Sequence, residues 1–449
     1  MTDSIGLDRR AFLRGAGMTA VAGAATAAGS LAANAGETGP RPMKGSKYDL
    51  DEIYDRYGTD SVKWDRQVER WGEEQFDIGM GIADMDFRTA PAVKDAIIER
   101  AQHENWGYLS STESLREAIS MWNSSRHGYE LDPESIVITT GVHPGLIAAL
   151  NTVAQPATKV IMTTPTYNGF YGDLRWSRTL ANDSEMYKDD DGVYHIDWDD
   201  FESRLTPDTR AFLLCNPQNP TGNCWSEEDL LRMGELCLKN GVTVLADEIH
   251  CDFVMKGQKY TPFASLPDKD IVNNSLTFKA ISKTFSLAGM KNAYFFSTNP
   301  VLLERVKYNH RPDINTLGVV ANEAAYREGA EWFDQVLAYI DRNHEFVESY
   351  IAERIPMLKY KKAEGTYLAW LDVSAPVEAL DAASMAEKED LRSAEHYMEK
   401  WFVENAGVQL NPGSTYGTGG AGHMRMNLGA PRPLIEQALD KLNTALQRV

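Results

Sequence analysis

The sequence predicts an α/β protein in which a mostly parallel sheet carries helices on both faces, joined to a smaller α+β domain. Two observations carry this prediction. Short β-rich runs alternate with amphipathic helical stretches between residues 136 and 296, as expected of parallel strands joined by crossover helices. From about residue 326 the pattern changes to longer helical stretches that flank a few short strands.

The expected strands are β-branched or aliphatic runs bounded by turn residues. The helix at residues 227–239 has the clearest signals, because Ser226 is a good N-cap and Asn240-Gly241 ends it. In the smaller domain we expect helices near 330–354 and 391–405. The predicted strands of the large domain are 136–140, 159–163, 211–215, 242–246, 275–278 and 294–296, and those of the small domain are 366–371 and 424–428.

Composition excludes several classes of protein. The 449 residues are 43% hydrophobic and 24% charged, an ordinary globular balance that disfavours a disordered or fibrous chain. The formal net charge of −20 disfavours nucleic-acid binding. Four cysteines without a close CxxC pair argue against a disulfide scaffold and a structural zinc site, so we expect no metal.

The N-terminus is similar to an export signal of the twin-arginine (Tat) type. Arg9-Arg10 precedes an uncharged Ala/Gly-rich stretch, residues 15–35, that closes on the cleavage pattern Ala33-Asn34-Ala35. The stretch is too rich in Ala and Gly for a convincing membrane anchor, so we expect export without stable membrane insertion, or a cytoplasmic protein if the signal is cryptic.

We divide the remaining chain into three parts. Residues 36–89 are expected to form an N-terminal arm and part of the small domain, residues 90–325 the large domain, and residues 326–449 the small C-terminal domain. Parallel sheets bind ligands beyond the carboxyl ends of their strands, so polar residues that follow predicted strands are the first candidates for a site.

Three such residues follow strands at spacings of 28 and 36 positions. Asn219 lies in a turn with two prolines and Gly222, Asp247 ends a buried strand, and Lys283 follows the strand at 275–278. A buried aspartate needs a cation or donors, and a desolvated lysine is a nucleophilic amine that can form a Schiff base. Taken singly, each has a structural alternative: a plain turn, a capping aspartate and an exposed lysine.

Arg425 lies inside the predicted apolar strand at 424–428. A buried arginine needs a partner, and its planar fork matches a substrate carboxylate. A structural salt bridge is the alternative, and local evidence leaves the two open.

In their order and spacing these residues resemble the fold-type I pyridoxal-phosphate (PLP) enzymes, the aspartate aminotransferase superfamily. More narrowly, the chain is similar to the cystathionine β-lyase group, also described as cysteine-S-conjugate β-lyases. The resemblance covers essentially everything after residue 45. The stretches that carry it are 48–65, 83–87 (Ala-Asp-Met-Asp-Phe), 106–108, 165–167, 217–222, 247–250, 366–372 and 416–425.

The resemblance implies a fold-type I architecture with a seven-stranded type of sheet, PLP as the cofactor of the large domain, and a role for each matching residue. Lys283 would form the Schiff base with PLP and move the Cα proton. Asp247 would pair with the pyridine nitrogen, Asn219 would donate to the ring's phenolic oxygen, and Tyr167 would stack on the ring.

Further residues are implied to hold the phosphate or the substrate. The backbone of Val142 and His143, before a helix expected to start near Pro144, would bind the phosphate. Tyr108 would reach the phosphate of a neighbouring subunit and assist catalysis there, which implies a homodimer with shared active sites. Arg425, with Asn219, would bind the amino-acid substrate. Ser282 is a further phosphate donor and His250 belongs to the cofactor-binding set.

Three positions and one short stretch depart from the pattern of the superfamily. Lys291 stands where an arginine is common, eight residues after Lys283, and a lysine contacts phosphate only as a point charge. His250 replaces a tyrosine common in aminotransferases, which favours the lyase group. Residues 79–82 (Gly-Met-Gly-Ile) are smaller than expected, and His143 is also unexpected.

The function implied is PLP-dependent α,β-elimination, in which cystathionine or a related cysteine S-conjugate gives a thiol, pyruvate and ammonia. The alternative is a class I/II aminotransferase acting on an amino acid and a 2-oxo acid. Racemisation and oxidative deamination are further outcomes of the same carbanion. A third hypothesis is a PLP-binding protein without catalysis, which the presence of Lys283, Asp247 and Arg425 disfavours.

Overall fold

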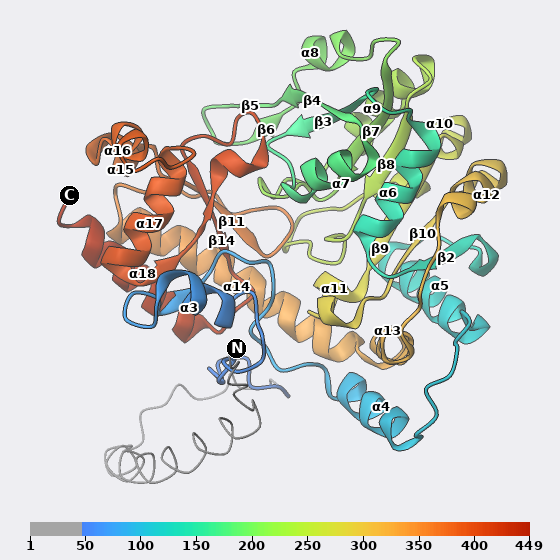
Figure 1. Ribbon diagram of the computed structural model, residues 1–449, viewed down its shortest axis with the longest axis horizontal. Coiled ribbons are helices and arrows are strands. Elements are labelled where there is room, and N and C mark those ends of the chain that lie inside the picture. The colour runs from blue at the N-terminus through green and yellow to red at the C-terminus, as the bar shows by residue number, and fades with distance from the viewer. Residues whose placement is uncertain (1–46) are drawn as a thin grey trace, which may run out of the picture. The chain divides into compact units, whose positions relative to one another are not determined.

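A seven-stranded sheet organises the described residues, 47–449, of the computed structural model (Figure 1). The predicted export signal at residues 1–35 lies outside the described residues. The strands follow the order β2 (Ile136–Thr139), β10 (Ala293–Phe296), β9 (Ser275–Ala280), β8 (Thr243–Asp247), β7 (Thr209–Cys215), β3 (Lys159–Thr164) and β4 (Leu180–Glu185).

Strand direction places the carboxyl ends of six strands at one edge of the sheet. Only β10 runs antiparallel to its neighbours, β2 and β9, whereas the pairs from β9 to β4 are parallel. All six predicted strands of this sheet are present, and the predicted α/β class is confirmed. Central strands such as β7 and β8 are nearly continuous apolar runs, because helices bury both faces of a parallel sheet, whereas the edge strand β4 is mostly polar.

Helices cover the two faces of the sheet. On one face, α6 (Val142–Val153), α7 (Gly169–Ser177) and α12 (Pro300–Asn309) pack on side chains such as Leu213 and Leu245. On the other, α8 (Trp198–Ser203), α9 (Glu227–Lys239) and α10 (Lys269–Asn273) pack on Phe212 and Val244. The hydroxyl of Ser226 accepts from the amide of Asp229, so the predicted N-cap of α9 is confirmed.

A 25-residue helix, α14 (Ala330–Arg354), extends from the large-sheet region to the second sheet (Figure 1). Its first half packs with α5 (Glu113–His127) through Phe333, whose ring meets that of Trp122 edge-on, and adds Ile340 to the same apolar cluster. Its second half contributes Val347 and Ile351 to a separate apolar cluster. The remaining helices of the first region are α4 (Pro91–Gln102), α11 (Ile281–Thr284) and α13 (Thr316–Glu328).

The second apolar cluster lies under a three-stranded sheet of order β11 (Leu368–Asp372), β14 (His423–Asn427) and β13 (Asn411–Pro412). The pair β1 (Ile78–Gly79) and β12 (Val408–Gln409) brings the N-terminal segment to this region. Its helices are α3 (Asp65–Trp71), α15 (Ser374–Ala379), α16 (Ala382–Lys388), α17 (Ala394–Ala406) and α18 (Arg432–Leu446). The domain boundaries at 89/90 and 325/326 stay predictions.

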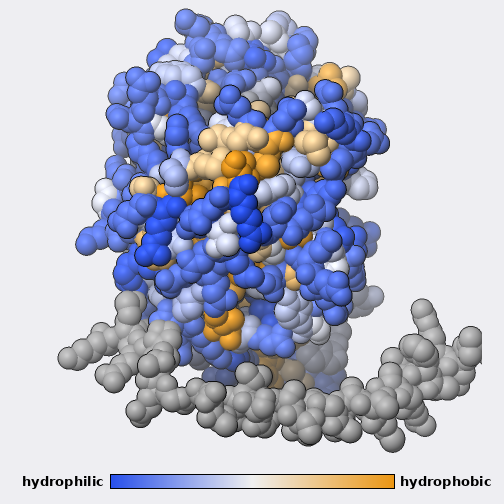
Figure 2. Space-filling view, turned by 90° about the vertical axis from the view of Figure 1, so that its left-hand side faces the viewer, coloured by the Kyte–Doolittle hydropathy of each residue, from blue (hydrophilic) through white to orange (hydrophobic). Residues whose placement is uncertain are grey.

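Short elements complete the described chain. The hairpin of β5 (Tyr187–Lys188) and β6 (Tyr194–His195) stands apart from the large sheet, and the 3-10 helices are η1 (Pro133–Ser135), η2 (Phe263–Ser265), η3 (Ala288–Met290) and η4 (Gly413–Tyr416). One face of the molecule is mostly hydrophilic, with apolar residues gathered in a band across it (Figure 2). Among residues 47–449, no helix has the length and apolarity needed to span a membrane.

Candidate active site

The predicted site residues of the large domain gather at the carboxyl edge of the large sheet. Asp247 is the last residue of β8, Asn219 follows β7, and Lys283 lies in α11 directly after β9. These three strands are adjacent and parallel, so their ends meet at one place. The sequence reasoning therefore placed these residues correctly relative to the sheet.

Arg425 joins this edge from the second sheet. It lies in the middle of β14, is 3% exposed, and its Cζ stands 5.0 Å from the ring centroid of Tyr416. One terminal nitrogen donates to Oδ1 of Asn219 at 3.1 Å and the other to the carbonyl of Gly81 at 2.8 Å. The guanidinium thus has only neutral acceptors within hydrogen-bond distance among the described residues, which leaves its charge available for a carboxylate.

Lys283 presents its amine to the same space. Its Nζ donates to the carbonyl of Ala83 at 2.9 Å. Burial, and after it the nearby Arg425 charge, lowers the pKa of Lys283 from 10.5 to about 8, against the opposing effect of Asp84 and Asp247. A lysine with such a pKa has a substantial neutral fraction near neutral pH, which is what a nucleophilic amine requires.

Asp247 is the buried acid of the site. It is 4% exposed, and its Oδ1 accepts from the amide of Ile249 at 3.1 Å. Burial raises the pKa of Asp247 from 3.8 to about 7. A cationic group bound against Asp247 would reverse this effect, because a neighbouring opposite charge favours the carboxylate.

Two aromatic rings lie at the start of α6 and α7. Tyr167, predicted to stack on a cofactor, has its ring centroid 5.6 Å from that of His143 at an interplanar angle of 33°. Helix α6 begins at Val142, two residues before the predicted start, with Gly141 as its N-cap and no side chain capping its first amides. Such amides form a ready site for an anion.

The other predicted site residues range from fully buried to fully exposed. His250 is 2% exposed, its ring meets that of Tyr367 edge-on, and burial holds its pKa well below 6.5, so it is neutral. Ser282 lies in α11 and is partly buried. Tyr108 is fully exposed between α4 and α5, and Lys291 is exposed with φ of 51°. The structure therefore does not bring Tyr108 to the site within its own chain.

Sequence reasoning missed the part played by residues 81–86. Besides the carbonyls of Gly81 and Ala83, this segment offers the side chain of Asp84, whose Oδ1 accepts from the hydroxyl of Ser286 at 2.8 Å. Asn427 donates to the carbonyls of Ile82 and Asp84, each at 2.7 Å. Backbone carbonyls cannot be recognised in a sequence, so the stretch 83–87 was the only sequence signal for this segment.

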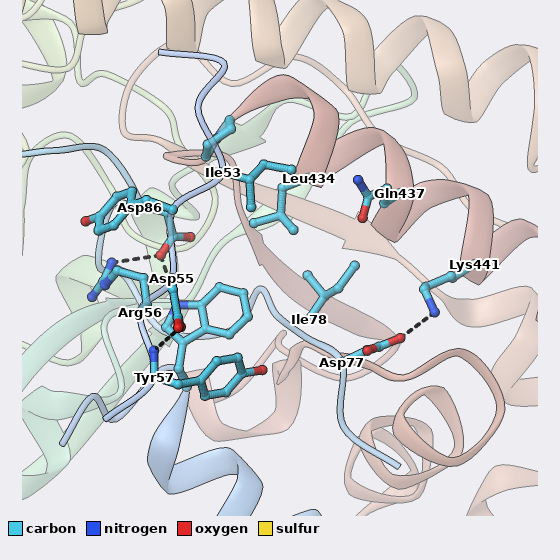
Figure 3. A pocket seen from close by; sticks show the side chains of 13 residues that line it. Ile53, Asp55, Arg56, Tyr57, Asp77, Ile78, Asp86, Leu434, Gln437 and Lys441 are labelled. Carbon is cyan, nitrogen blue, oxygen red and sulfur yellow. Dashed lines mark hydrogen bonds and ion pairs between the residues drawn. The ribbon is translucent and has the colours of Figure 1, made fainter. Parts of the chain in front are cut away.

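Buried charges fix this segment next to a pocket of about 300 Å³ (Figure 3). Asp86 lines the pocket and accepts from Arg56 at 2.8 Å, from Lys63 at 2.5 Å and from the indole of Trp64 at 3.0 Å. Lys63 is fully buried. A buried carboxylate with three donors is stable in place, so these ion pairs hold the segment whose carbonyls face Arg425 and Lys283.

Several buried polar atoms around the site have no hydrogen-bond partner within residues 47–449. They are Nδ1 of His250, Nε of Arg425, Oδ1 of Asn216, Oε1 of Gln218 and Oγ1 of Thr166. Buried polar groups are normally satisfied, so a cluster of unsatisfied ones calls for an explanation. A bound polar ligand is such an explanation, and the set of an amine, a buried acid and open helix amides suits a phosphorylated pyridine aldehyde.

Comparisons with known proteins identify the family. Residues 76–442 match the family "Aminotransferase class I and II". The chain belongs to this family. The predicted resemblance to the aminotransferase superfamily is thereby confirmed, and with it the predicted fold class.

Within the family, several of the relatives found carry lyase names, whereas others, such as a probable N-acetyl-LL-diaminopimelate aminotransferase of Bacillus subtilis (strain 168) at 27% identity, carry aminotransferase names. The chain is 37% identical over 405 residues to cystathionine β-lyase PatB of Bacillus subtilis (strain 168), covering 88% of this chain and 99% of PatB. Among solved structures it is similar to the PLP-bound C–S lyase of Staphylococcus hominis (TM-score 0.79, 31% identity, 90% of this chain and 99% of that one). It is also similar to cystalysin of Treponema denticola with its pyridoxal 5'-phosphate cofactor (TM-score 0.82, 29% identity, 89% and 99%).

Proposed function

We propose that this protein is a PLP-dependent carbon–sulfur β-lyase that cleaves cystathionine or a related cysteine S-conjugate into a thiol, pyruvate and ammonia. The observation that carries the proposal is the amine of Lys283, with a pKa of about 8, at the strand edge shared by Asp247 and Arg425. The lyase names of relatives at up to 37% identity support elimination over transamination.

The cofactor would be held from several sides. Lys283 would hold its aldehyde carbon through Nζ, and Asp247 would face the pyridine nitrogen, where a bound cation would keep the carboxylate ionised despite its burial. The open amides at the start of α6, with Ser282, would bind the phosphate. Tyr167 would cover the pyridine ring, and His250 would be a further cofactor-binding residue.

Asn219 and Arg425 would bind the substrate together. The Oδ1 of Asn219 already accepts from Arg425, so the Nδ2 group is the donor left for the cofactor's phenolic oxygen. A substrate carboxylate would take the place of the Gly81 carbonyl on the guanidinium, because a charged acceptor binds it more strongly than a neutral one.

Proton transfer at Cα would fall to Lys283. When bound, pyridoxal phosphate supplies the electron sink that stabilises negative charge at Cα. Lys283 Nζ would accept the Cα proton, the Cβ–S bond would break with its electron pair leaving on sulfur, and the thiolate would take up a proton. Addition of water then gives pyruvate and ammonia, so each turnover consumes one water and one substrate.

A product assay tests this function. The protein supplied with PLP is incubated with cystathionine or an S-alkyl cysteine, and pyruvate, thiol and new amino acid are measured together. We expect pyruvate and thiol in equal amounts without any added 2-oxo acid. Amino transfer to an added 2-oxo acid without free thiol would establish the aminotransferase alternative, and no turnover of a broad amino-acid panel would favour a non-catalytic PLP-binding protein.

We also propose a homodimer in which Tyr108 serves the neighbouring subunit. The support is its full exposure in a loop, residues 103–108, that is exposed throughout. Mixing the inactive variants Lys283→Ala and Tyr108→Phe under conditions that allow subunit exchange tests this. One site of each mixed dimer would have both side chains, so activity should return. Continued inactivity of a mixture proven to exchange would contradict the shared site.

Export by the signal at residues 1–35 is a separate proposal, supported by the twin arginines and the Ala33-Asn34-Ala35 pattern. N-terminal sequencing of protein from the exported fraction should begin at residue 36. Recovery of the full-length chain in the cytoplasm alone would contradict it.

A further inference from the structure

A histidine–aspartate pair lies beside the candidate site, and its two side chains have no part in the chemistry above. Nδ1 of His143, the second residue of α6, stands 2.8 Å from both carboxylate oxygens of Asp173 in α7. Asp173 is 3% exposed, and His143 is its hydrogen-bond partner. Because a buried carboxylate is costly without a donor or a cation, Asp173 requires a proton on Nδ1.

The other ring nitrogen of His143 faces Tyr167. Its Nε2 lies 3.3 Å from the phenolic oxygen. Gly169 allows this packing, since a Cβ there would lie 2.5 Å from the Tyr167 ring and 2.7 Å from Cε1 of His143. Asp173, His143 and Tyr167 thus form one line of contacts from a buried acid to the edge of the site.

We propose that His143 and Asp173 are positioning residues that set the direction of the Tyr167 hydroxyl, making it a donor toward the bound ligand when His143 is charged. With Nδ1–H held by Asp173, the charged imidazole also carries a proton on Nε2, which it donates to the phenolic oxygen. The phenolic hydrogen then points elsewhere. In the neutral imidazole, Nε2 accepts the phenolic hydrogen, and Tyr167 offers only an acceptor to a ligand.

The surrounding charges favour the charged state. The hydrogen bond that His143 donates to Asp173 raises the pKa of His143 above 6.5, and Asp247 at the end of β8 raises it too, whereas burial and Lys283 in α11 lower it. Tyr167 itself stays protonated, since burial raises its pKa to about 12. The inference rests on the proposed function for one point only, that Tyr167 contacts the cofactor.

The first test measures the ionisation of His143 in the PLP-loaded enzyme. With 13C at Cε1 of its nine histidines, NMR titration follows each ring, and His143→Gln assigns the signal. We expect a pKa above 6.5 that falls by about one unit or more in Asp173→Asn, since the replaced charge was the main stabilising partner. The matched control is Asp189→Asn, at the partly exposed His195–Asp189 pair of 2.7 Å, which should leave His143 unchanged. An equal His143 pKa in Asp173→Asn would overturn the pairing.

The second test determines whether the Tyr167 hydroxyl transmits the ionisation of His143 to the bound cofactor. The visible absorption of bound PLP, titrated with pH, should contain a step at the His143 pKa. The step should move with His143 in Asp173→Asn and vanish in His143→Gln and in Tyr167→Phe, while Tyr167→Phe keeps the raised His143 pKa. A step that persists in Tyr167→Phe would overturn the role of the hydroxyl.

Failure of the proposed function would be distinguishable from failure of this inference. If no thiol substrate gives pyruvate but both titrations behave as stated, the lyase proposal fails and the positioning role stands. If Asp173→Asn does not fold, His143→Gln decides alone: loss of the absorption step supports the role, and an unchanged step overturns it.

Discussion

The candidate site around Lys283 and the polar network around Lys279 stabilise buried charge to opposite extents, although the two lysines lie only four residues apart in the sequence. Lys279, in β9, is 2% exposed, and its Nζ donates to Asn123 at 3.0 Å and lies 3.6 Å from Glu248. Burial alone would lower the pKa of Lys279, but the neighbouring Cys251, Tyr129 and Glu248 raise it well above 10.5.

Glu248 is equally well satisfied, whereas its sequence neighbour Asp247 is not. Glu248 accepts from the hydroxyl of Tyr260 at 2.5 Å and from the amide of Phe263 at 2.8 Å. Asp247 has one backbone donor, at 3.1 Å, and burial raises its pKa to about 7. Burial raises the pKa of Glu248 as well, but Glu248 has a cation and two hydrogen-bond donors, whereas Asp247 has one backbone donor and the Lys283 amine has one carbonyl acceptor.

This difference in how well buried charged groups are hydrogen-bonded indicates where a ligand is expected to bind. Groups that are buried without full satisfaction reduce stability and persist where function needs them. The two regions also touch, because Thr284, next to Lys283, donates to Asp252 at 2.6 Å. Burial raises the pKa of Asp252, but hydrogen bonds from His127 and Thr284 outweigh it and bring the value to about 2. The paired network therefore anchors α11, the helix that carries Lys283.

The largest expected effect is on turnover. Lys283→Ala should reduce the rate of pyruvate formation by about 1,000-fold or more, because it removes the group that moves the Cα proton. The melting temperature of the cofactor-free protein should not fall, since at pH 7 the buried amine is held below its unfolded pKa of 10.5 and therefore costs stability. Exposed Lys256→Ala is the control, and equal turnover in Lys283→Ala would refute the assignment.

Replacement of Lys279 should lower the stability of the folded protein rather than act directly on turnover. Lys279→Met leaves the Glu248 carboxylate buried without its cation, which typically costs about 3–5 kcal/mol. Urea denaturation measures the loss, and adding Glu248→Gln should recover part of it. Exposed Lys269→Met should change little. If Lys279→Met is as stable as the wild type, the two lysines do not differ as described.

Substrate binding should depend on the fork of Arg425. Arg425→Lys keeps the charge but loses one of two parallel hydrogen bonds, worth about 1.5–3 kcal/mol for a charged partner. We expect KM for the amino acid to rise about 10–100-fold with a smaller change in kcat. The exposed Arg210→Lys serves as the control. An unchanged KM would mean that Arg425 is a structural residue.

The smallest effect concerns Asp247 and pH. Its pKa is raised from 3.8 to about 7 on folding, so its favourable contribution is complete below 3.8 and is lost as pH rises through 7. In the cofactor-free protein, Asp247→Asn should therefore gain stability relative to wild type between pH 6 and 8, by about 1–2 kcal/mol. Denaturation at pH 6 and 8 measures this, with exposed Asp313→Asn as control. A constant difference across that range would contradict the raised pKa.

Much of this arrangement was predictable from the sequence for a physical reason. Asn219, Asp247 and Lys283 each follow a strand, and parallel neighbours bring such residues to one edge. Asp173 was not predictable, because its contact with His143 depends on how α6 and α7 pack on the sheet. The carbonyls of Gly81 and Ala83 were also invisible, since every residue has one.

The paired network was hidden for a different reason. Lys279 occupies a strand position that normally takes an apolar residue, and its partner Asn123 lies 156 positions away. No local pattern connects such residues, and only the packed structure shows that one lysine is satisfied and the other is not.

Location of the reactive lysine tests the central claim most directly. The PLP-loaded enzyme is reduced with borohydride, which fixes the bound pyridoxyl group on its lysine, and is then digested and sequenced by mass spectrometry. We predict modification of Lys283, with Lys279 unmodified. Modification of Lys279, or of neither lysine in a protein that has taken up PLP, would contradict the account.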